Sequence, residues 1–452
     1  MTEEEKNPLD KEVHPVRILD SAPVAFNRLL VMIGEFSYAA SWVYVEQTVT
    51  ERKDKKTGEM IPLPEPVTEK HQELVILRED GVIFTDAPVP GSRPMSALDM
   101  DIKLDCPPAS HLLWSGAGIN RYLVGDRPDP VNVFNDVCDV VDQYMDFHGS
   151  FGDQTSMCKL IGCYVISTYM LDQLPVTGYL WPNGERGSGK SHLLQVISVL
   201  SYLGQFILAG GSFASIRNLA GLGATLCFDD AEQIMDKKKG DPDKQALLLA
   251  GNRKGATVTI MELAGDKKWV TRNINAYCPR CFSAIGLPND TLSSRTIFIP
   301  LMASDDGVKA SSDPLDFENW PTDRQRLMDD LWALSLRYLR KIGTCDRLVP
   351  GRVSLTGRSL QPWRSILAVA MWIEGCGYKG LFSEMQSLVD AYGKEENFTG
   401  NNHHNLVLHA LRKIVSHHPG GRDIPFPTST LSGYIDDLAK AEELMDDGDR
   451  HY

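Results

Sequence analysis

A single glycine-rich octapeptide restricts the fold of this chain more than any other feature. It consists of Gly184, Glu185, Arg186, Gly187, Ser188, Gly189, Lys190 and Ser191. It fits the pattern G-x-x-x-x-G-K-[ST] without a gap. An apolar strand candidate at residues 178–181 precedes it, and an amphipathic segment beginning at His192 follows it. Such a turn lets backbone N–H groups form a nest for phosphate, to which the helix N-terminus adds partial positive charge. The octapeptide therefore predicts a strand–loop–helix unit of an α/β fold that binds a nucleotide.

The polar residues of this phosphate loop have expected roles in binding ATP and Mg²⁺. The ammonium group of Lys190 would reach the β- and γ-phosphates, and the hydroxyl of Ser191 would be a ligand of Mg²⁺. The whole loop, through His192 on the following helix, is expected to line the nucleotide.

A second motif is an apolar run that ends in acidic residues. Residues 224–228 are followed by Asp229, Asp230 and, a little later, Glu232. A buried strand that ends in acids places carboxylates at the C-terminal edge of a parallel sheet, where ligands bind. Asp229 is the predicted Mg²⁺ ligand. Asp230 is predicted to activate the attacking water, with Glu232 as the alternative base.

The front of the chain, residues 1–125, is predicted to be a separate α+β domain of unknown role. Residues 41–50 are rich in Val, Tyr and Thr and predict a strand. Residues 51–69 are charged and proline-rich and predict a mobile loop. The pair Asp80-Gly81 predicts the turn of a β-hairpin.

The remainder predicts three further units. Residues 126–305 form an α/β ATPase core with a parallel sheet, and a helical lead-in over 131–174 opens it. Residues 306–395 predict a helical lid. Residues 396–452 predict a helical or partial winged-helix segment with an acidic tail.

Composition excludes several classes of protein. With 452 residues, 42% of them hydrophobic, the chain can build large cores and is neither disordered nor collagen-like. A net charge of −14 argues against a uniformly basic nucleic-acid-binding protein. The longest apolar stretch, residues 160–171, is shorter than the roughly 20 residues of a membrane span, so no membrane partner is expected. Nine scattered cysteines and an acidic beginning without an apolar signal segment predict a cytoplasmic location.

The phosphate loop together with Phe228-Asp229-Asp230 resembles the AAA+ ATPases. Within them, it is similar to the helicase-like ATPases of phages, plasmids and genomic islands, which are often fused to primases, and to superfamily-3 helicases. The resemblance runs from about residue 131 to residue 377. Supporting segments lie at residues 249–256, 293–297 and 355–363. The resemblance implies a P-loop AAA+ core, ATP hydrolysis and assembly into a hexameric ring.

The resemblance also implies roles for three more residues. Arg295, just before a strand candidate, would be an arginine finger that reaches the γ-phosphate held by a neighbouring subunit. Arg358 resembles the sensor-2 arginine of a helical lid. The alternatives are a surface arginine that caps a helix end and a plain salt bridge. Sensor 1 departs from the family pattern, because Leu287 stands where a polar residue is expected and Asn289 is the substitute.

Residues 256–274 predict a β-hairpin between the acidic motif and Arg295. Lys267 and Lys268 occupy its expected tip, beside Trp269. Six basic residues against two acidic ones lie between positions 253 and 280. Cations and an aromatic ring suit single-stranded DNA, through phosphate neutralisation and base stacking. In the resembling helicases, a hairpin at this place projects into the pore of the ring.

These patterns favour an ATP-dependent DNA helicase or translocase of a mobile or accessory genetic element. Single-stranded DNA, further copies of the chain and a primase or another replication protein are the partners that this function implies. A protein-remodelling or sensing ATPase, for example in phage defence, and a nucleotide-gated scaffold are the alternatives. A salt-sensitive affinity for single strands would favour the helicase, and a stable protein partner without DNA affinity would favour remodelling.

Overall fold

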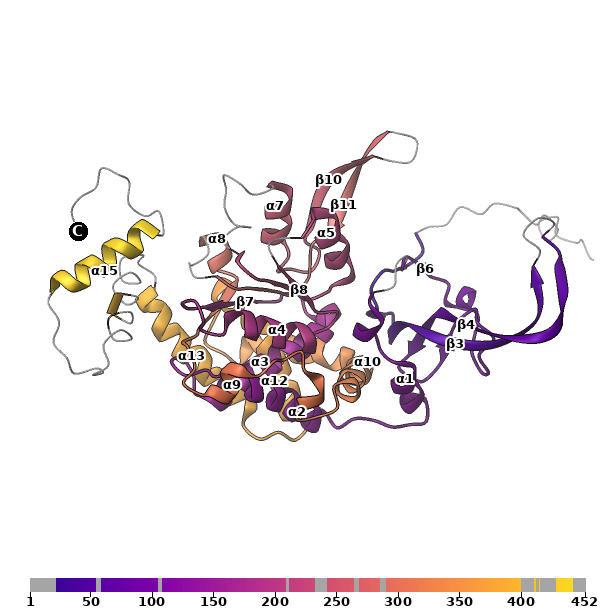
Figure 1. Ribbon diagram of the computed structural model, residues 1–452, viewed down its shortest axis with the longest axis horizontal. Helices are drawn as coiled ribbons and strands as arrows, with labels where there is room; N and C mark the ends of the chain where they lie inside the picture. Colours follow the sequence, from indigo (N-terminus) through magenta and orange to yellow (C-terminus); the bar gives the residue numbers. More distant parts are fainter. Residues whose placement is uncertain are drawn as a thin grey trace, which may run out of the picture.

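The fold is mixed α/β, as predicted, and is known from a computed structural model. The structure describes residues 22–53, 58–104, 108–208, 211–231, 242–263, 268–284, 290–399, 410–411, 414 and 428–441. Figure 1 shows a central body of sheet and helices, with the N-terminal strands on one side and the C-terminal helix α15 (Thr428–Ala441) on the other.

The centre of the body is a parallel sheet with the strand order β13-β7-β12-β9-β8. The strands are β7 (Tyr179–Asn183), β8 (Gln205–Ile207), β9 (Leu226–Phe228), β12 (Arg280–Phe282) and β13 (Thr296–Pro300). Every residue of β7, β9 and β12 is buried, as expected for a parallel sheet covered on both faces. Strand β12 lies between β7 and β9, the two strands that lead into the sequence motifs.

Helices pack against this sheet and against one another. They include α2 (Pro130–Tyr144), α3 (Gln154–Tyr169), α4 (Lys190–Leu200), α10 (Arg324–Leu348) and α12 (Arg364–Gly375). In Figure 1, α2, α3, α4 and α12 lie on the opposite side of the sheet from α5 (Phe213–Leu222) and α7 (Pro242–Ala250). Three of the helices have an aspartate as the N-cap residue before them, and its carboxylate accepts a backbone N–H of the first turn; these are Asp129, Asp153 and Asp323. Helices α2 and α3 occupy the segment for which the sequence predicts a helical lead-in.

The N-terminal part is a small α+β unit, as predicted. Its strands are β1 (Ala25–Phe26), β2 (Leu30–Ile33), β3 (Phe36–Lys53), β4 (Met60–Arg78), β5 (Ile83–Phe84) and β6 (Asp101–Ile102). Helix α1 (Gly116–Leu123) closes the unit and packs on α10. Strands β2 to β5 form one antiparallel sheet, and Asp80-Gly81 lies in the predicted turn between β4 and β5.

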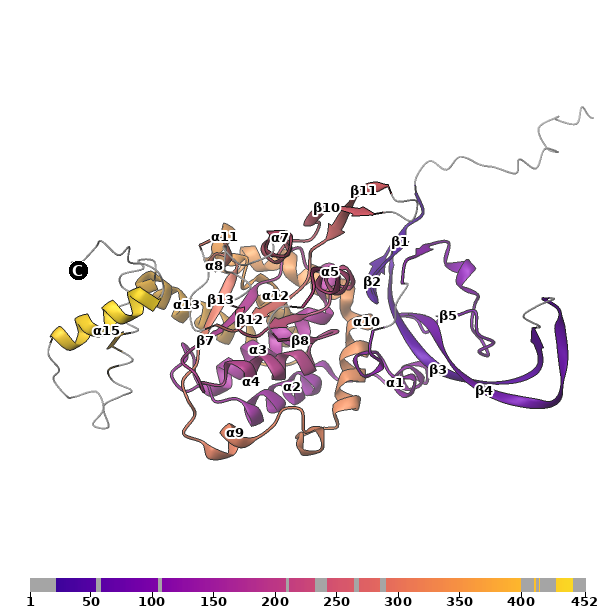
Figure 2. The same cartoon turned by 45° about the horizontal axis from the view of Figure 1, so that its top comes forward.

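The prediction of a loop over residues 51–69 is wrong. Apart from residues 54–57, which lie outside the described part, most of this segment belongs to the long antiparallel ribbon of β3 and β4. Pro62 pairs opposite Glu51, just beyond a register shift after Val49. Strand β5 pairs with β4 only at Ile76 and Leu77, near the end of β4. The outer edge of β4 at Pro62 therefore has no partner strand among the described residues, and a proline there interrupts no hydrogen-bonded ladder. Figure 2 shows the ribbon curving away from the body.

The segment after β13 is helical, as the predicted lid requires. Besides α10 and α12 it contains α9 (Gly307–Ser311), α11 (Gly357–Leu360) and α13 (Leu381–Thr399), and α8 (Asp290–Ser293) precedes β13. Single 3-10 turns lie at Met95–Leu98, Ser110–Leu112, Leu171–Gln173, Phe317–Asn319 and Val349–Gly351. Most of the proposed winged-helix segment lies outside the described residues. No described helix combines the length and the apolar character that crossing a lipid bilayer demands.

Candidate functional site

The glycine-rich octapeptide forms the turn between β7 and α4, as predicted. Gly187 and Gly189 have φ of 84° and 86°, in the left-handed region that a Cβ disfavours. Gly189 is the N-cap of α4, which begins at Lys190. A Cβ at Gly184 would clash with the carbonyl oxygen of Leu301, just past β13. The backbone of the loop therefore requires the glycines of the motif.

The loop has the donors that a phosphate group needs. Gly189 supplies no side-chain cap, so N–H groups of the first turn of α4 remain available to an anion. The Nζ atom of Lys190 donates to the carbonyl oxygens of Gly184 and Glu185, at 2.7 Å each, which holds the ammonium group over the loop. The hydroxyl of Ser188 is buried and has no hydrogen-bond partner in the described structure. This set of groups fits a triphosphate.

The predicted Mg²⁺ ligands lie together at the C-terminal edge of the sheet. The hydroxyl of Ser191 donates to Oδ1 of Asp229 at 3.0 Å, and Ser283 donates to the same oxygen. Asp229 is only 9% exposed, and no described lysine or arginine forms an ion pair with it. A buried carboxylate beside a hydroxyl, with no protein cation against it, suits a hard divalent cation.

Asp230, the predicted base, follows Asp229 and is exposed. Its φ is 54°, a left-handed conformation that is uncommon for residues other than glycine and concentrates at functional sites. Glu232, the alternative base, lies outside the described residues. Asp230 is therefore the acidic side chain of the described motif that water can reach.

Ser283 is a functional candidate that the sequence patterns missed. It follows β12 directly, and β12 pairs in register with β9, with Cys281 opposite Cys227 and Phe282 opposite Phe228. This register brings the Ser283 hydroxyl to the carboxylate of Asp229. Asn289, the polar substitute predicted from sequence, lies outside the described residues. The signal that could have found Ser283 is that it ends a short apolar run, Cys281-Phe282, just as Asp229 ends the apolar run of the acidic motif.

A cavity of about 390 Å³ lies near the connection between α2 and α3. Residues 146–149 and 152–154, between α2 and α3, line it together with Asp306 and Lys309. The residue before this lining, Met145, reaches to 3.8 Å from a Cβ placed on Gly189, but no residue of the phosphate loop lines the cavity. No motif in the sequence marks this cavity, because its walls come from two distant segments.

His192 lies in the first turn of α4, next to the phosphate loop. Its ring centroid is 6.4 Å from that of Tyr144, and its Nε2 is buried without a hydrogen-bond partner in the described structure. Burial lowers the pKa of His192, against a smaller opposite effect of Asp313. The imidazole therefore stays neutral to lower pH than an exposed histidine.

Arg295 and Arg358 lie near the other edge of the sheet, where the strands begin. Thr296, the residue after Arg295, pairs opposite Tyr179 at the start of β7, and a Cβ at Gly178 would clash with the carbonyl of Pro362. The five residues of β7 span about 16 Å at the usual rise per residue. The chain therefore does not bring the edge that carries these arginines to its own phosphate loop.

The side chains of these two arginines differ in their surroundings. The guanidinium of Arg295 donates to the carbonyl oxygen of Leu249, near the end of α7, which is the helix-capping role that the sequence left open. Arg358 is exposed and belongs to α11. An action of Arg295 on a phosphate would therefore require another subunit.

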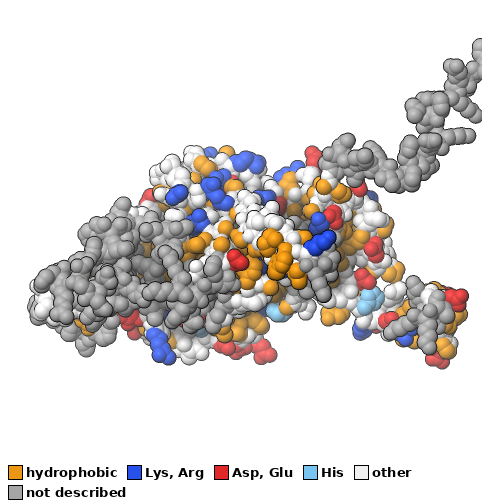
Figure 3. Space-filling model, turned by 90° about the horizontal axis from the view of Figure 1, so that it is seen from above, with side chains coloured by type: hydrophobic (Ala, Val, Ile, Leu, Met, Phe, Trp, Pro, Cys, Tyr) orange, Lys and Arg blue, Asp and Glu red, His pale blue; other side chains and the backbone are white. Residues whose placement is uncertain are grey.

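The predicted β-hairpin is confirmed as β10 (Thr257–Leu263) and β11 (Trp269–Asn275). Leu263 pairs opposite Trp269, and these two side chains are 53% and 66% exposed. Met261, on the same face, is 57% exposed. Lys268 is also exposed, whereas Lys267 lies outside the described residues. Figure 3, which looks down on the side from which the hairpin rises, shows hydrophobic and basic side chains next to one another.

The count of basic residues overstated the charge of this hairpin. Arg280 is fully buried at the start of β12, where it donates to the hydroxyl of Tyr179 and to the carbonyls of Leu248 and Ala276, each at 2.7 Å. Lys254 forms an ion pair with Asp172. Lys268 and Arg272 remain exposed, so the outward face of the described hairpin is partly basic and partly apolar.

Comparison with known proteins gives distant structural likenesses. No protein-family model and no curated protein matches the chain. It is similar to the SCCmec type IV Cch active helicase, with a TM-score of 0.37 and 10% identity, over 96% of each chain. It is also similar to the JCV helicase, with a TM-score of 0.22 and 15% identity, over 62% of this chain and 71% of that one. For the C-terminal region of NrS-1, the TM-score is 0.24 at 9% identity, over 71% of this chain and 89% of that one.

Proposed function

We propose that this chain is an ATP-hydrolysing motor that moves along single-stranded DNA as a ring. The observation that carries the proposal is the bond between Ser191 and Asp229, which joins the phosphate loop to the acidic motif at one edge of the sheet. Two motifs that are separate in sequence thus form one site. Their chemistry is that of a nucleoside triphosphate with Mg²⁺.

Within this site, each side chain has a distinct task. Ser191 and Asp229 would hold Mg²⁺, which when bound would neutralise charge on the phosphate oxygens. Lys190 would exchange the loop carbonyls for phosphate oxygens. Asp230 would accept the proton of the attacking water, and Ser283 would orient the carboxylate of Asp229.

The ring is part of the proposal because the predicted finger, Arg295, does not lie at the phosphate loop of its own chain. Arg295 lies near the opposite edge of the sheet, so it would complete the site of a neighbouring subunit. A finger of this kind stabilises the transition state by neutralising charge, and is worth about 10³-fold or more in rate. A ring of six subunits would give each phosphate loop such a neighbour.

The hairpin is the proposed contact with DNA. Trp269 offers an exposed aromatic face on which a base can stack, and Lys268 offers a cation for a phosphate group. Leu263 extends the apolar surface opposite Trp269. This contact would combine stacking with charge, because exposed Lys268 and Arg272 accompany Trp269 on the hairpin.

The exposed apolar side chains of the hairpin also favour a second candidate, a protein-remodelling ATPase. Thr259 and Asn273 share a hydrogen bond of 2.8 Å on the face that continues to Met261 and Trp269. Side chains of this kind can contact an extended peptide as well as a nucleic acid. The two candidates differ in the polymer that stimulates hydrolysis.

The test measures mass and ATPase rate of the full chain, with and without ATP and a short oligothymidylate. We expect a larger assembly with ATP and faster hydrolysis with the oligonucleotide. Lys190→Met should abolish hydrolysis, whereas Lys341→Met, at an exposed position of α10, should not. Stimulation by an unfolded protein instead of DNA would replace the proposal by the remodelling function. A wild-type chain that does not hydrolyse ATP would reject both.

A further inference from the structure

Two buried charged groups lie where the N-terminal unit meets the ends of the hairpin. We call the N-terminal unit, from β1 to α1, the N-terminal module. We call residues 252–256 and 275–278, on either side of β10 and β11, the feet of the hairpin. Arg28 of the module and Asp172 of the core contact the feet, and neither residue belongs to the nucleotide site.

Arg28 holds the foot that follows β11. Its guanidinium donates to the carbonyl oxygen of Tyr277 at 2.7 Å, and its Cζ lies 5.5 Å from the centre of the Tyr277 ring. Arg28 is only 7% exposed and forms no ion pair with a described residue. A buried cation whose partners are a carbonyl group and a ring has a strongly defined position, because leaving them would strand the charge.

Asp172 links the module to the other foot. Its Oδ2 accepts the backbone N–H of Met32 on β2 at 3.1 Å, and its Oδ1 lies 3.4 Å from Nζ of Lys254. Lys254 precedes β10, and its own N–H donates to the carbonyl of Pro175. One carboxylate therefore bridges a strand of the module and a foot of the hairpin.

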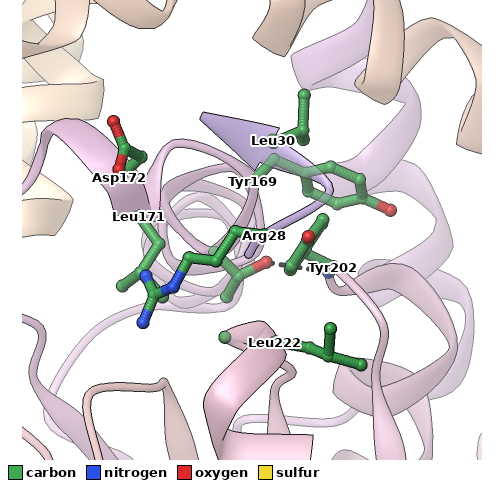
Figure 4. A pocket seen from close by; sticks show the side chains of 9 residues that line it. Arg28, Leu30, Tyr169, Leu171, Asp172, Tyr202 and Leu222 are labelled. Atoms are coloured by element: carbon green, nitrogen blue, oxygen red, sulfur yellow. Dashed lines mark hydrogen bonds between the residues drawn. The ribbon is translucent and has the colours of Figure 1, made fainter. Parts of the chain in front are cut away.

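The surroundings of this contact are closely packed. Figure 4 shows the side chains of Arg28, Leu171 and Asp172 around a small cavity. The cavity measures about 10 Å³, which is close to the least that one water needs. Gly223 faces the guanidinium, and a Cβ there would lie 3.3 Å from Cζ of Arg28. The packing leaves Arg28 little freedom to move independently of the foot.

The foot held by Arg28 leads directly to the nucleotide site. After Tyr277 the chain enters β12, and Ser283 at the end of this strand donates to Asp229. The buried Arg280 fixes the start of the same strand. A displacement at Tyr277 is thus transmitted along a short, buried strand.

We propose that Arg28 and Asp172 are positioning residues through which the N-terminal module sets the position of the hairpin relative to the nucleotide site. The part of this inference that concerns DNA rests on the proposed function. We call the contacts of Arg28 and Asp172 with the feet of the hairpin the clamp. The clamp does not rest on the proposed function, since the hydrogen bonds that form it involve neither ATP nor DNA.

The first experiment measures amide hydrogen exchange in the feet of the hairpin, in the full chain without DNA. Arg28→Met should speed exchange of the foot at residues 275–278 at least fivefold, and Arg28→Lys, which can still donate to Tyr277, should restore most of the protection. The matched control is Arg121→Met, which removes a 3.2 Å contact of the module with Asp329 on α10, away from the hairpin. Lys254→Met, at a half-exposed side chain, tests the other foot without altering the module.

The second experiment measures ATPase rates of the same variants with and without oligothymidylate. Arg28→Met should keep the DNA-free rate within twofold and lose at least threefold in stimulation. Unchanged exchange in the feet for both Arg28→Met and Lys254→Met, or an equal effect of Arg121→Met, would overturn the inference. Faster exchange in a protein whose wild type does not respond to DNA would leave the clamp standing and reject the proposed function.

Discussion

Ser191 and Asp229 share a hydrogen bond of 3.0 Å although they follow two strands that are not neighbours in the sheet. Strand β12 separates β7 from β9, and Ser283, the residue that follows β12, donates to the same carboxylate oxygen. The carboxylate of Asp229 is thus held by hydroxyl groups from both sides. This arrangement makes the site testable one atom at a time.

Substitutions of Asp229 and Asp230 should impair different steps of the ATPase reaction. Asp229→Asn keeps the size of the side chain but removes the charge that holds Mg²⁺, so both Mg²⁺-dependent ATP binding and hydrolysis should fall. Asp230→Asn should keep ATP binding and lower hydrolysis about 10²-fold to 10⁴-fold, the usual worth of a general base. Nucleotide binding and turnover measured across a Mg²⁺ titration separate these outcomes. Loss of ATP binding in Asp230→Asn alone would reverse the two assignments.

Ser283→Ala should lower the affinity of the site for Mg²⁺ without unfolding the protein. The substitution removes one hydroxyl from Asp229 and leaves Ser191 in place. Partners of metal ligands typically change metal affinity about 10-fold to 100-fold. Half-saturating Mg²⁺ in the ATPase reaction is the measurement. Ser304→Ala is the matched control, because that hydroxyl bonds to Asp146 at 2.6 Å instead. Equal effects of the two substitutions would remove Ser283 from the site.

Trp269→Ala should weaken binding of single-stranded DNA, because a stacked base contributes about 1–3 kcal/mol. Tyr44→Ala is a control at another exposed aromatic side chain, 73% exposed on β3. Fluorescence anisotropy of a labelled oligonucleotide gives both affinities. Wild-type affinity in Trp269→Ala would show that the hairpin does not stack on DNA.

Lys268→Ala should act through salt dependence. Loss of one phosphate contact lowers the slope of log affinity against log salt by about one. The same anisotropy titration, repeated at several salt concentrations, measures this slope. An unaltered slope would mean that the Lys268 ammonium does not contact a phosphate group.

Arg295 can be tested by mixing two inactive proteins. Arg295→Ala keeps an intact phosphate loop, and Lys190→Met keeps an intact arginine. If Arg295 completes the site of a neighbouring subunit, a mixture should recover part of the ATPase rate that each protein lacks alone. Thermal unfolding of Arg295→Ala is needed alongside, because this side chain also caps α7 at Leu249. A mixture as inactive as its components, from proteins that assemble normally, would exclude a finger in trans.

His192 should make the folded protein sensitive to mild acid. Burial lowers the pKa of His192, so the unfolded chain binds this proton at a higher pH than the folded one does. The free energy of unfolding should therefore fall as the pH drops below about 6.5, the ordinary value for histidine. Denaturant titrations of wild type and His192→Gln above and below this pH measure the difference. A wild type that loses no more stability than the variant would contradict this prediction.

Sequence patterns predicted the elements of the site better than their partners. Local signals such as the glycine-rich octapeptide and the alternation of β10 and β11 arise from neighbouring residues, and the structure has a turn and a hairpin at these places. The loop predicted over residues 51–69 failed because charge and proline outweighed the pairing of β4 with β3. The positive charge predicted for the hairpin failed for Arg280, which lies in the core.

The sequence by itself determined that this chain contains a glycine-rich turn between a strand and a helix, an acid-ended strand and an exposed hairpin. The reason is that glycine at positive φ, buried apolar runs and alternating strands are properties of short segments. Only the tertiary structure decided that Ser283 joins Ser191 at Asp229, and that Arg28 of the N-terminal module reaches Tyr277. Strand order and module packing join residues that are far apart in the chain, and no local pattern records which of them will meet.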